Sequence, residues 1–223
     1  DAFETGLIFL ALAVGSFFAA PLSATLARRF GPRRAVTLGM GLEAVGIFFT
    51  TLFISPSTSG FLLAVPLFVY GVGVGLATAQ LTSIVLSDIP PARSGLASGT
   101  NSTMRQVGSA LGVAILGTVL FATLVSQTEA NLATAVPTMP AACRDLLATL
   151  VDESAGQILP ALRDPAAAAG QVGDFGGGSL PPEQAACFAD PTFVASLPAT
   201  VEPIENAFTT ATHVTGFTAL GFV

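Results

Sequence analysis

Residues 6–34 read GLIFLALAVGSFFAAPLSATLARRFGPRR, in which an uncharged apolar run at residues 6–27 is followed by four arginines around Gly31 and Pro32. The hydrocarbon core of a bilayer is about 30 Å thick, so a helix of about 20 apolar residues crosses it. Three further runs of this length follow, at residues 35–55, 61–86 and 104–125, and a fifth begins near residue 207. The pattern predicts an all-α, polytopic membrane helical bundle.

The composition supports a membrane rather than an aqueous environment. Hydrophobic residues make up 52% of the 223 residues and charged residues only 10%, whereas a soluble domain carries about 25% charged residues. Buried helices of a large soluble protein are the alternative. Four successive runs with almost no charge favour the lipid bilayer as the main partner of the chain.

The arginines predict how the helices are oriented, because short cytoplasmic loops retain Lys and Arg. The link between the first two runs carries Arg28, Arg29, Arg33 and Arg34, and the link between the third and fourth carries Arg93. Both links are therefore expected in the cytoplasm of a bacterial cell. The uncharged turn at residues 56–60 and the segment at 126–205 are then extracytoplasmic.

The segment at 126–205 differs in kind from the apolar runs. It holds ten of the fourteen acidic residues and nine of the fifteen prolines, which is typical of a solvated loop or a small cap. An apolar stripe at helical spacing over residues 143–162 predicts a helix on the outer mouth or the lipid headgroups. A second short helix is expected from residue 181 to 188, with a glycine-rich turn at 170–178 between them.

The two cysteines of the chain, Cys143 and Cys187, both fall in this segment. Because the extracytoplasmic compartment is oxidising, we expect a disulfide between the two short helices. Two unpaired thiols in a mobile loop are the alternative.

The ends of the chain suggest a piece of a longer protein. The chain starts at Asp1 without a methionine and stops at Val223 inside an apolar run. Its first residues are acidic, whereas a secretory signal begins with positive charge.

Two stretches carry a resemblance to a known family. Residues 24–34, with Arg28, Arg29, Gly31, Arg33 and Arg34, resemble the cytoplasmic loop motif G-x-L-a-D-r-x-G-r-r of the major facilitator superfamily. Ala24 stands in place of the first glycine and Arg28 in place of the aspartate. The acid that acts as a conformational latch in better-kept copies is therefore missing.

The second stretch, residues 88–114, is similar to the run before and within the penultimate helix of the fourteen-span drug:proton antiporters of that superfamily. With residues 70–75, the resemblance covers about residues 1–125 and leaves the outer segment unmatched. It implies four helices of the C-terminal half at 1–125, a cap at 126–205 and the start of the final helix at 206–223. It also implies the N-terminal half of the same transporter as partner, with a small-molecule substrate bound between the halves.

Glycine pairs along these runs suit closely packed helices. The pairs are Gly71 with Gly75, Gly95 with Gly99, and Gly108 with Gly112. Small residues four apart let two helix backbones approach each other in lipid, where no hydrophobic effect drives association. Such surfaces allow helices to slide or rock, and static packing is the alternative.

Polar residues within the apolar runs are the candidate functional residues, because a charge at mid-bilayer costs about 2.5–3.5 kcal/mol. Glu43 is the candidate proton carrier. Arg105 either reaches the membrane interface or lines the transport pathway with Asn101 and Gln106. Tyr70 and Gln80 on the third run are the other pathway candidates.

The sequence offers no catalytic, metal-binding or nucleic-acid-binding constellation, so we expect neither an enzyme nor a cofactor. We expect export of small, amphipathic or drug-like molecules by proton antiport with alternating access. The alternative is a membrane-anchored extracytoplasmic binding or receptor module. Deleting residues 130–203 separates the two, since an exporter keeps some activity and a binding module loses all of it.

Overall fold

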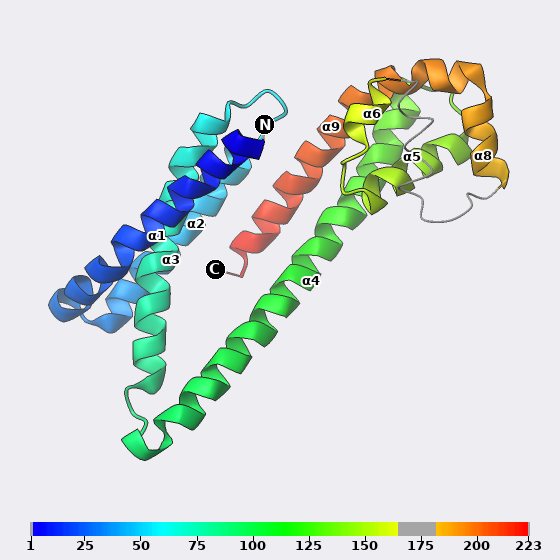
Figure 1. Cartoon of the computed structure of the whole chain (residues 1–223). Coiled ribbons are helices and arrows are strands. Elements are labelled where there is room, and N and C mark those ends of the chain that lie inside the picture. The colour runs from blue at the N-terminus through cyan, green and yellow to red at the C-terminus, as the bar shows by residue number, and fades with distance from the viewer. Residues whose placement is uncertain (1, 165–181, 223) are drawn as a thin grey trace. The chain divides into compact units, whose positions relative to one another are not determined.

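The computed structural model describes residues 2–164 and 182–222, and over these residues the chain folds into helices without a strand (Figure 1). The fold confirms the predicted all-α class. The helices, in chain order, are α1 Ala2–Phe30, α2 Pro32–Phe53, α3 Gly60–Leu86, the short η1 Pro91–Arg93, α4 Ser94–Ala135, α5 Ala141–Glu153, α6 Leu159–Leu162, α8 Pro182–Ala189 and α9 Pro191–Leu220.

Four of the described helices are long and apolar enough to cross a membrane. They lie at Gly6–Phe30, Pro32–Phe53, Gly60–Leu86 and Pro91–Ala135 and contain the four predicted runs almost entirely. Large apolar side chains on them face outward, with Phe17 73%, Phe61 77% and Leu96 75% exposed. Water would penalise such surfaces and lipid would not, in agreement with a polytopic membrane bundle.

The chain divides into two compact units. Unit 1 comprises residues 1–117 and 215–223, and unit 2 comprises residues 118–214. Helices α4 and α9 each contribute to both units. We describe each unit by itself.

Unit 1 is built on α3, which packs against both α1 and α2 (Figure 1). Glycines make both contacts. A Cβ on Gly15 of α1 would lie 2.5 Å from the carbonyl oxygen of Phe68, and one on Gly39 of α2 would lie 2.7 Å from the backbone nitrogen of Ala77. Real Cβ atoms do not approach so closely, so these positions hold the helices backbone to backbone.

The turn between α1 and α2 depends on one glycine. Gly31 has φ 86° and ψ 151°, a backbone conformation that side chains with a Cβ rarely adopt. Pro32 follows as the first residue of α2, where its fixed φ suits the helix and its missing N–H leaves no bond unmade. The predicted tight turn at Gly31 and Pro32 is thus a single-residue break between two long helices.

Unit 2 has a hydrophobic core of its own. The side chains that fill it come from the second half of α4, from α5 and α6, and from the first part of α9. They include Leu124, Leu132, Leu146, Leu150, Ile158, Leu162, Leu197 and Ile204, each at most 1% exposed. The described residues of unit 2 therefore fold around an apolar core of their own, and we refer to unit 2 as the cap.

Two details of the predicted cap are wrong. The helix expected over residues 143–162 breaks after Glu153, where Ala155 and Gly156 have φ 47° and φ 81°, and resumes as α6. The apolar residues of the stripe at 143–162 are buried in the core of unit 2. They therefore do not form a surface that could lie on lipid headgroups. The expected second helix is present as α8 at Pro182–Ala189, whereas the glycine-rich turn at 170–178 lies outside the described residues.

The helices also cross the predicted domain boundaries. α4 continues without a break past residue 125 to Ala135, and Leu124, Thr128 and Leu132 are its buried positions. These residues are four apart and form one face. α9 begins at Pro191, well before the expected start at residue 206, and is not among the helices apolar enough to span a membrane by themselves.

Several contacts hold the cap together. The Sγ atoms of Cys143 and Cys187 are joined in a disulfide of 2.02 Å between α5 and α8. The amide of Asn131 on α4 donates to the carbonyl oxygen of Pro203 on α9 at 3.0 Å, and Arg163 pairs with Glu205 at 2.6 Å. The ion pair is exposed and stabilises the cap by at most about 1 kcal/mol.

Asp190 caps the start of α9. Its Oδ1 accepts hydrogen bonds from the hydroxyl of Thr192 at 2.6 Å and from the backbone nitrogen of Thr192 at 2.8 Å. These bonds favour the carboxylate and so lower the pKa of Asp190. The charged form that caps the helix therefore persists to a lower pH than an ordinary aspartate would allow.

Candidate functional site

The contact between α2 and α3 brings two of the predicted residues together. A Cβ on Gly73 of α3 would lie 2.6 Å from the backbone nitrogen of Glu43 and 2.8 Å from its Cγ. One turn away on each helix, Gly46 faces the Cβ of Tyr70, at 2.6 Å from an added Cβ. The missing side chains at Gly46 and Gly73 thus make room for Tyr70 and Glu43.

Glu43 and Tyr70 lie close enough for the carboxyl group and the phenol to interact electrostatically. Both side chains are half-buried. Within the described residues, Glu43 has no arginine or histidine in an ion pair with it. Carboxyl groups within membrane spans serve as proton carriers in transporters, so Glu43 remains a candidate for this role.

Gln80 has a different environment. It is 8% exposed, and its amide Nε2 donates to the hydroxyl of Ser23 on α1 at 3.2 Å. The Ser23 hydroxyl in turn donates to the carbonyl oxygen of Ala20 at 2.7 Å. Gln80 therefore links α3 to α1, an interaction that the sequence analysis did not identify.

The three candidates on α4 lie apart from that contact. Asn101 is half-buried, and Arg105 and Gln106 are exposed. In the part of the chain that the structure describes, Arg105 forms no ion pair. The glycines beside them, Gly95, Gly99, Gly108 and Gly112, have open space where a Cβ would be. Among the predicted glycine pairs, Gly71 with Gly75 makes a helix contact in unit 1, whereas a Cβ on either pair of α4 would meet no atom of the described residues within 4 Å.

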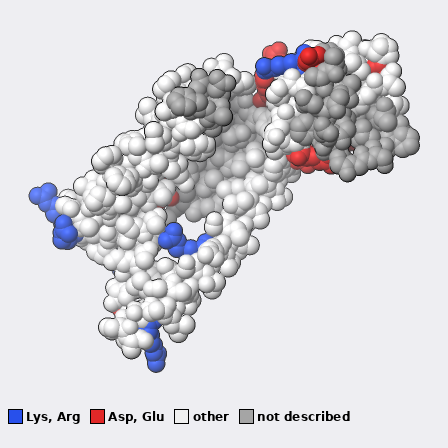
Figure 2. All heavy atoms as spheres, viewed as in Figure 1, with Lys and Arg blue, Asp and Glu red and all other residues white. Residues whose placement is uncertain are grey.

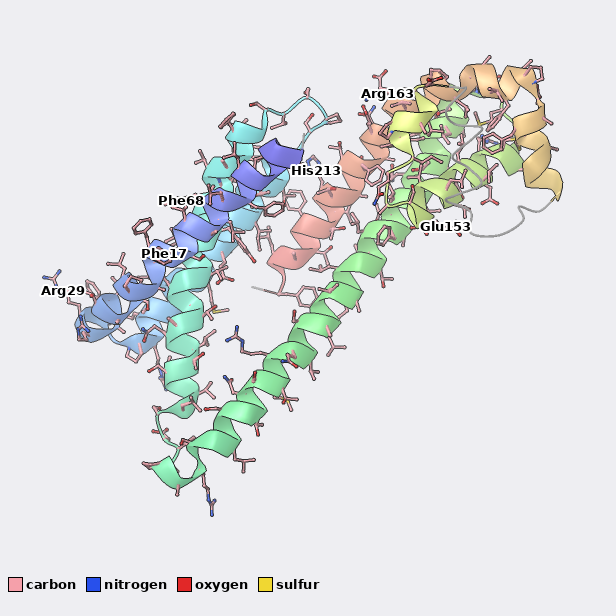
Figure 3. The ribbon with its side chains drawn as sticks, in the orientation of Figure 1. Phe17, Arg29, Phe68, Glu153, Arg163 and His213 are labelled. Carbon is pink, nitrogen blue, oxygen red and sulfur yellow. A yellow bond between two sulfur atoms is a disulfide. The ribbon has the colours of Figure 1, made fainter. Side chains whose placement is uncertain are left out.

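The loop motif forms the most strongly charged part of unit 1. Arg28, Arg29, Arg33 and Arg34 are all exposed, and the guanidinium of Arg28 donates to the hydroxyl of Thr25 at 3.2 Å. In Figure 2, basic side chains protrude at one end of the helices α1 to α3, and acidic side chains gather on unit 2. Figure 3 shows Arg29 projecting away from the end of α1.

A hollow of about 530 Å³ opens at the other end of α1 and α3 in unit 1. Its lining is mostly apolar and comes from the start of each helix and the turn before α3, with Leu7, Ile8, Ser59 and Phe61 among the residues. None of the candidate pathway residues lines it.

Comparison with known proteins identifies the class. Residues 1–201 match the family model described as the Major Facilitator Superfamily. The chain belongs to this superfamily, as its loop motif and its apolar helices suggested. It is thus a multi-pass membrane protein of a family of transporters.

Three relatives illustrate the similarity. The multidrug resistance protein Stp of Mycobacterium tuberculosis strain H37Rv is 34% identical over 151 residues, which cover 68% of this chain and 27% of Stp. The tetracenomycin C resistance and export protein of Streptomyces glaucescens is 32% identical over 150 residues, 64% of this chain and 27% of that protein. The multidrug efflux pump LfrA of Mycolicibacterium smegmatis is 32% identical over 117 residues, 52% of this chain and 23% of the pump.

The aligned part of this chain thus spans about a quarter of the length of these relatives. No solved structure matches the chain.

Proposed function

We propose that this chain is part of a secondary transporter that exports small, amphipathic or drug-like molecules by proton antiport. The observation that carries the proposal is the similarity to several relatives whose names state drug resistance, antibiotic export or multidrug efflux. The extracytoplasmic binding module, our alternative, has no comparable support, because residues 1–201 match a transporter family.

The mechanism requires two halves. Transporters built from repeats bind substrate near the middle of the bilayer, at the interface between repeats, and alternate access by rocking one half against the other. The close backbone contacts of α3 with α1 and α2 support the proposal, since three tightly packed helices suit a layer that rocks as a unit. The N-terminal half of the same transporter would supply the facing surface.

Uptake of a lipophilic cationic dye by inside-out vesicles, which corresponds to export from the cell, tests the function. Vesicles that contain the full-length protein should take up dye when their lumen is made acidic, and uptake should stop when a protonophore collapses the pH gradient. Uptake that continues without the gradient would contradict proton antiport, and absence of transport for a panel of amphipathic compounds would contradict export.

The Glu43→Gln substitution should abolish proton-driven uptake in the same vesicles while leaving substrate exchange without a gradient in place. Glutamine keeps the shape of the side chain and the contact with Gly73 but cannot release a proton, so the step that couples proton movement to rocking is lost. Initial rates of dye uptake with and without the pH gradient measure the effect.

Glu129→Gln in the cap is the matched control, since Glu129 is an exposed glutamate of unit 2, and it should keep the wild-type rate. Unchanged gradient-driven transport by Glu43→Gln would exclude Glu43 as the proton carrier. The proposal that the protein exports small molecules would not be affected by that result.

A further inference from the structure

The loop between α1 and α2 has a charge that the described protein does not neutralise. Four arginines lie within seven residues, Arg28 to Arg34, and all four side chains are exposed. Within residues 2–164 and 182–222, none of them forms an ion pair with a carboxylate. The hydrogen bond from Arg28 to the neutral hydroxyl of Thr25 leaves that charge in place.

The sequence around the loop offers no acid that could offset this charge. Residues 5–42 contain neither aspartate nor glutamate. Four like charges at this spacing repel one another unless an anion lies among them.

The charges at the ends of the two helices also favour a bound anion. Arg28 and Arg29 occupy the last turn of α1, where cations suit the helix dipole. Arg33 and Arg34 occupy the first turn of α2, which contains no acid and whose N-cap, Gly31, offers no side-chain oxygen. Positive charge at the positive end of a helix is unfavourable, and an anion there would relieve it.

The position of the loop selects the kind of anion. The loop joins two helices that are long and apolar enough to span the bilayer. Phe30, the last residue of α1, is 50% exposed, and Leu38, in the second turn of α2, is 51% exposed. Arginines flanked by exposed apolar side chains at the end of a span lie at the level of the lipid phosphates.

We propose that Arg28, Arg29, Arg33 and Arg34 form a binding site for the headgroup of an anionic phospholipid. Guanidinium groups donate paired hydrogen bonds to a phosphate, which suits arginine better than lysine for this site. Phe30 would lie beside the upper part of the acyl chains. The site ties the moving ends of α1 and α2 to the membrane surface and makes the protein sensitive to lipid composition.

The test compares two charge-matched variants of the full-length protein in lipid nanodiscs. Arg33→Gln with Arg34→Gln removes two charges from the site, and Arg144→Gln with Arg163→Gln removes two charges from unit 2. Each arginine near an anionic surface contributes about a fivefold preference, so the first variant should bind labelled phosphatidylglycerol about thirtyfold more weakly, measured against phosphatidylcholine. The control variant should bind it as the wild type does.

Equal phosphatidylglycerol binding by the two variants and the wild type would overturn the proposal. An equal loss in both variants would also overturn it, because it would show a response to net charge alone. A competition experiment with excess inorganic phosphate distinguishes a lipid site from a site for free phosphate. Phosphatidylglycerol that stays bound supports a lipid site, and phosphatidylglycerol that is displaced shows a site for free phosphate instead.

Discussion

Replacing Gly71 with alanine should destabilise unit 1 by about 1–3 kcal/mol or more, the range for overpacked contacts. The added methyl group would meet the carbonyl oxygen of Leu12 on α1 and would lie 2.9 Å from its carbonyl carbon. Both atoms belong to the backbone of a helix, which has no side-chain rotamer with which to move aside. α1 and α3 would therefore have to separate along their length.

Thermal unfolding of the full-length protein in detergent measures this loss. Gly41→Ala is the matched control, because Gly41 lies on α2 in the same unit and has nothing within 4 Å of an added Cβ. The control should be neutral or slightly stabilising, since alanine favours a helix over glycine by about 1 kcal/mol. Equal melting temperatures for Gly71→Ala and Gly41→Ala would contradict the packing described for α1 and α3.

Replacing Cys143 and Cys187 together with serine should destabilise the cap by up to about 4 kcal/mol. A cross-link between residues 44 apart in sequence removes that much chain entropy from the unfolded state, although measured values range from about 0 to 5 kcal/mol. The disulfide joins α5 to α8, and the buried residues of α5 form a large part of the core of unit 2. The loss should therefore spread through the cap.

The rate of limited proteolysis within residues 126–205 measures how readily the cap opens. Dithiothreitol should accelerate cleavage of the wild type to the rate of the double serine variant and leave the variant unchanged. Ala142→Ser, an exposed position beside Cys143, should behave as the wild type. Labelling of both cysteines by a thiol reagent in unreduced membranes would show that the pair is not bonded in the cell.

The membrane helices could be predicted from sequence because one physical requirement decides them. A span needs about 20 apolar residues, and the runs that begin at Gly6, Ala35 and Phe61 meet that requirement without any knowledge of their neighbours. The arginine-rich loop could be placed for the same reason, since glycine and proline end and begin helices by local geometry.

The cap could be predicted only in part. The apolar residues on either side of Gly156 keep helical spacing, so the stripe looked continuous, but a glycine after Ser154 was a signal for the end of a helix. The long extension of α4 to Ala135 is not apolar. It is stabilised by Leu124 and Leu132, which pack into the core of unit 2. The other residues of this core come from distant parts of the chain.

The roles of the polar residues were the least predictable. Gln80 and Tyr70 were both predicted as pathway residues, because each is a polar group on a run that resembles a cavity-lining helix of the family. The structure gives Gln80 a hydrogen-bond partner on α1 and places Tyr70 against Gly46 and near Glu43 on α2. Which neighbour a helical residue meets depends on how two helices are set against each other, and one sequence does not contain that information.

The account rests on these helices crossing a bilayer with the arginine-rich loop in the cytoplasm and the cap outside. Single cysteines introduced at Ser57, Ala92 and Thr149, all exposed, report this directly when intact cells are treated with a membrane-impermeant thiol reagent. We predict labelling of Ser57→Cys and Thr149→Cys in intact cells, and of Ala92→Cys only after the membrane is opened. Labelling of Ala92→Cys in intact cells would contradict the proposed orientation, and recovery of the protein in solution without detergent would contradict the membrane bundle itself.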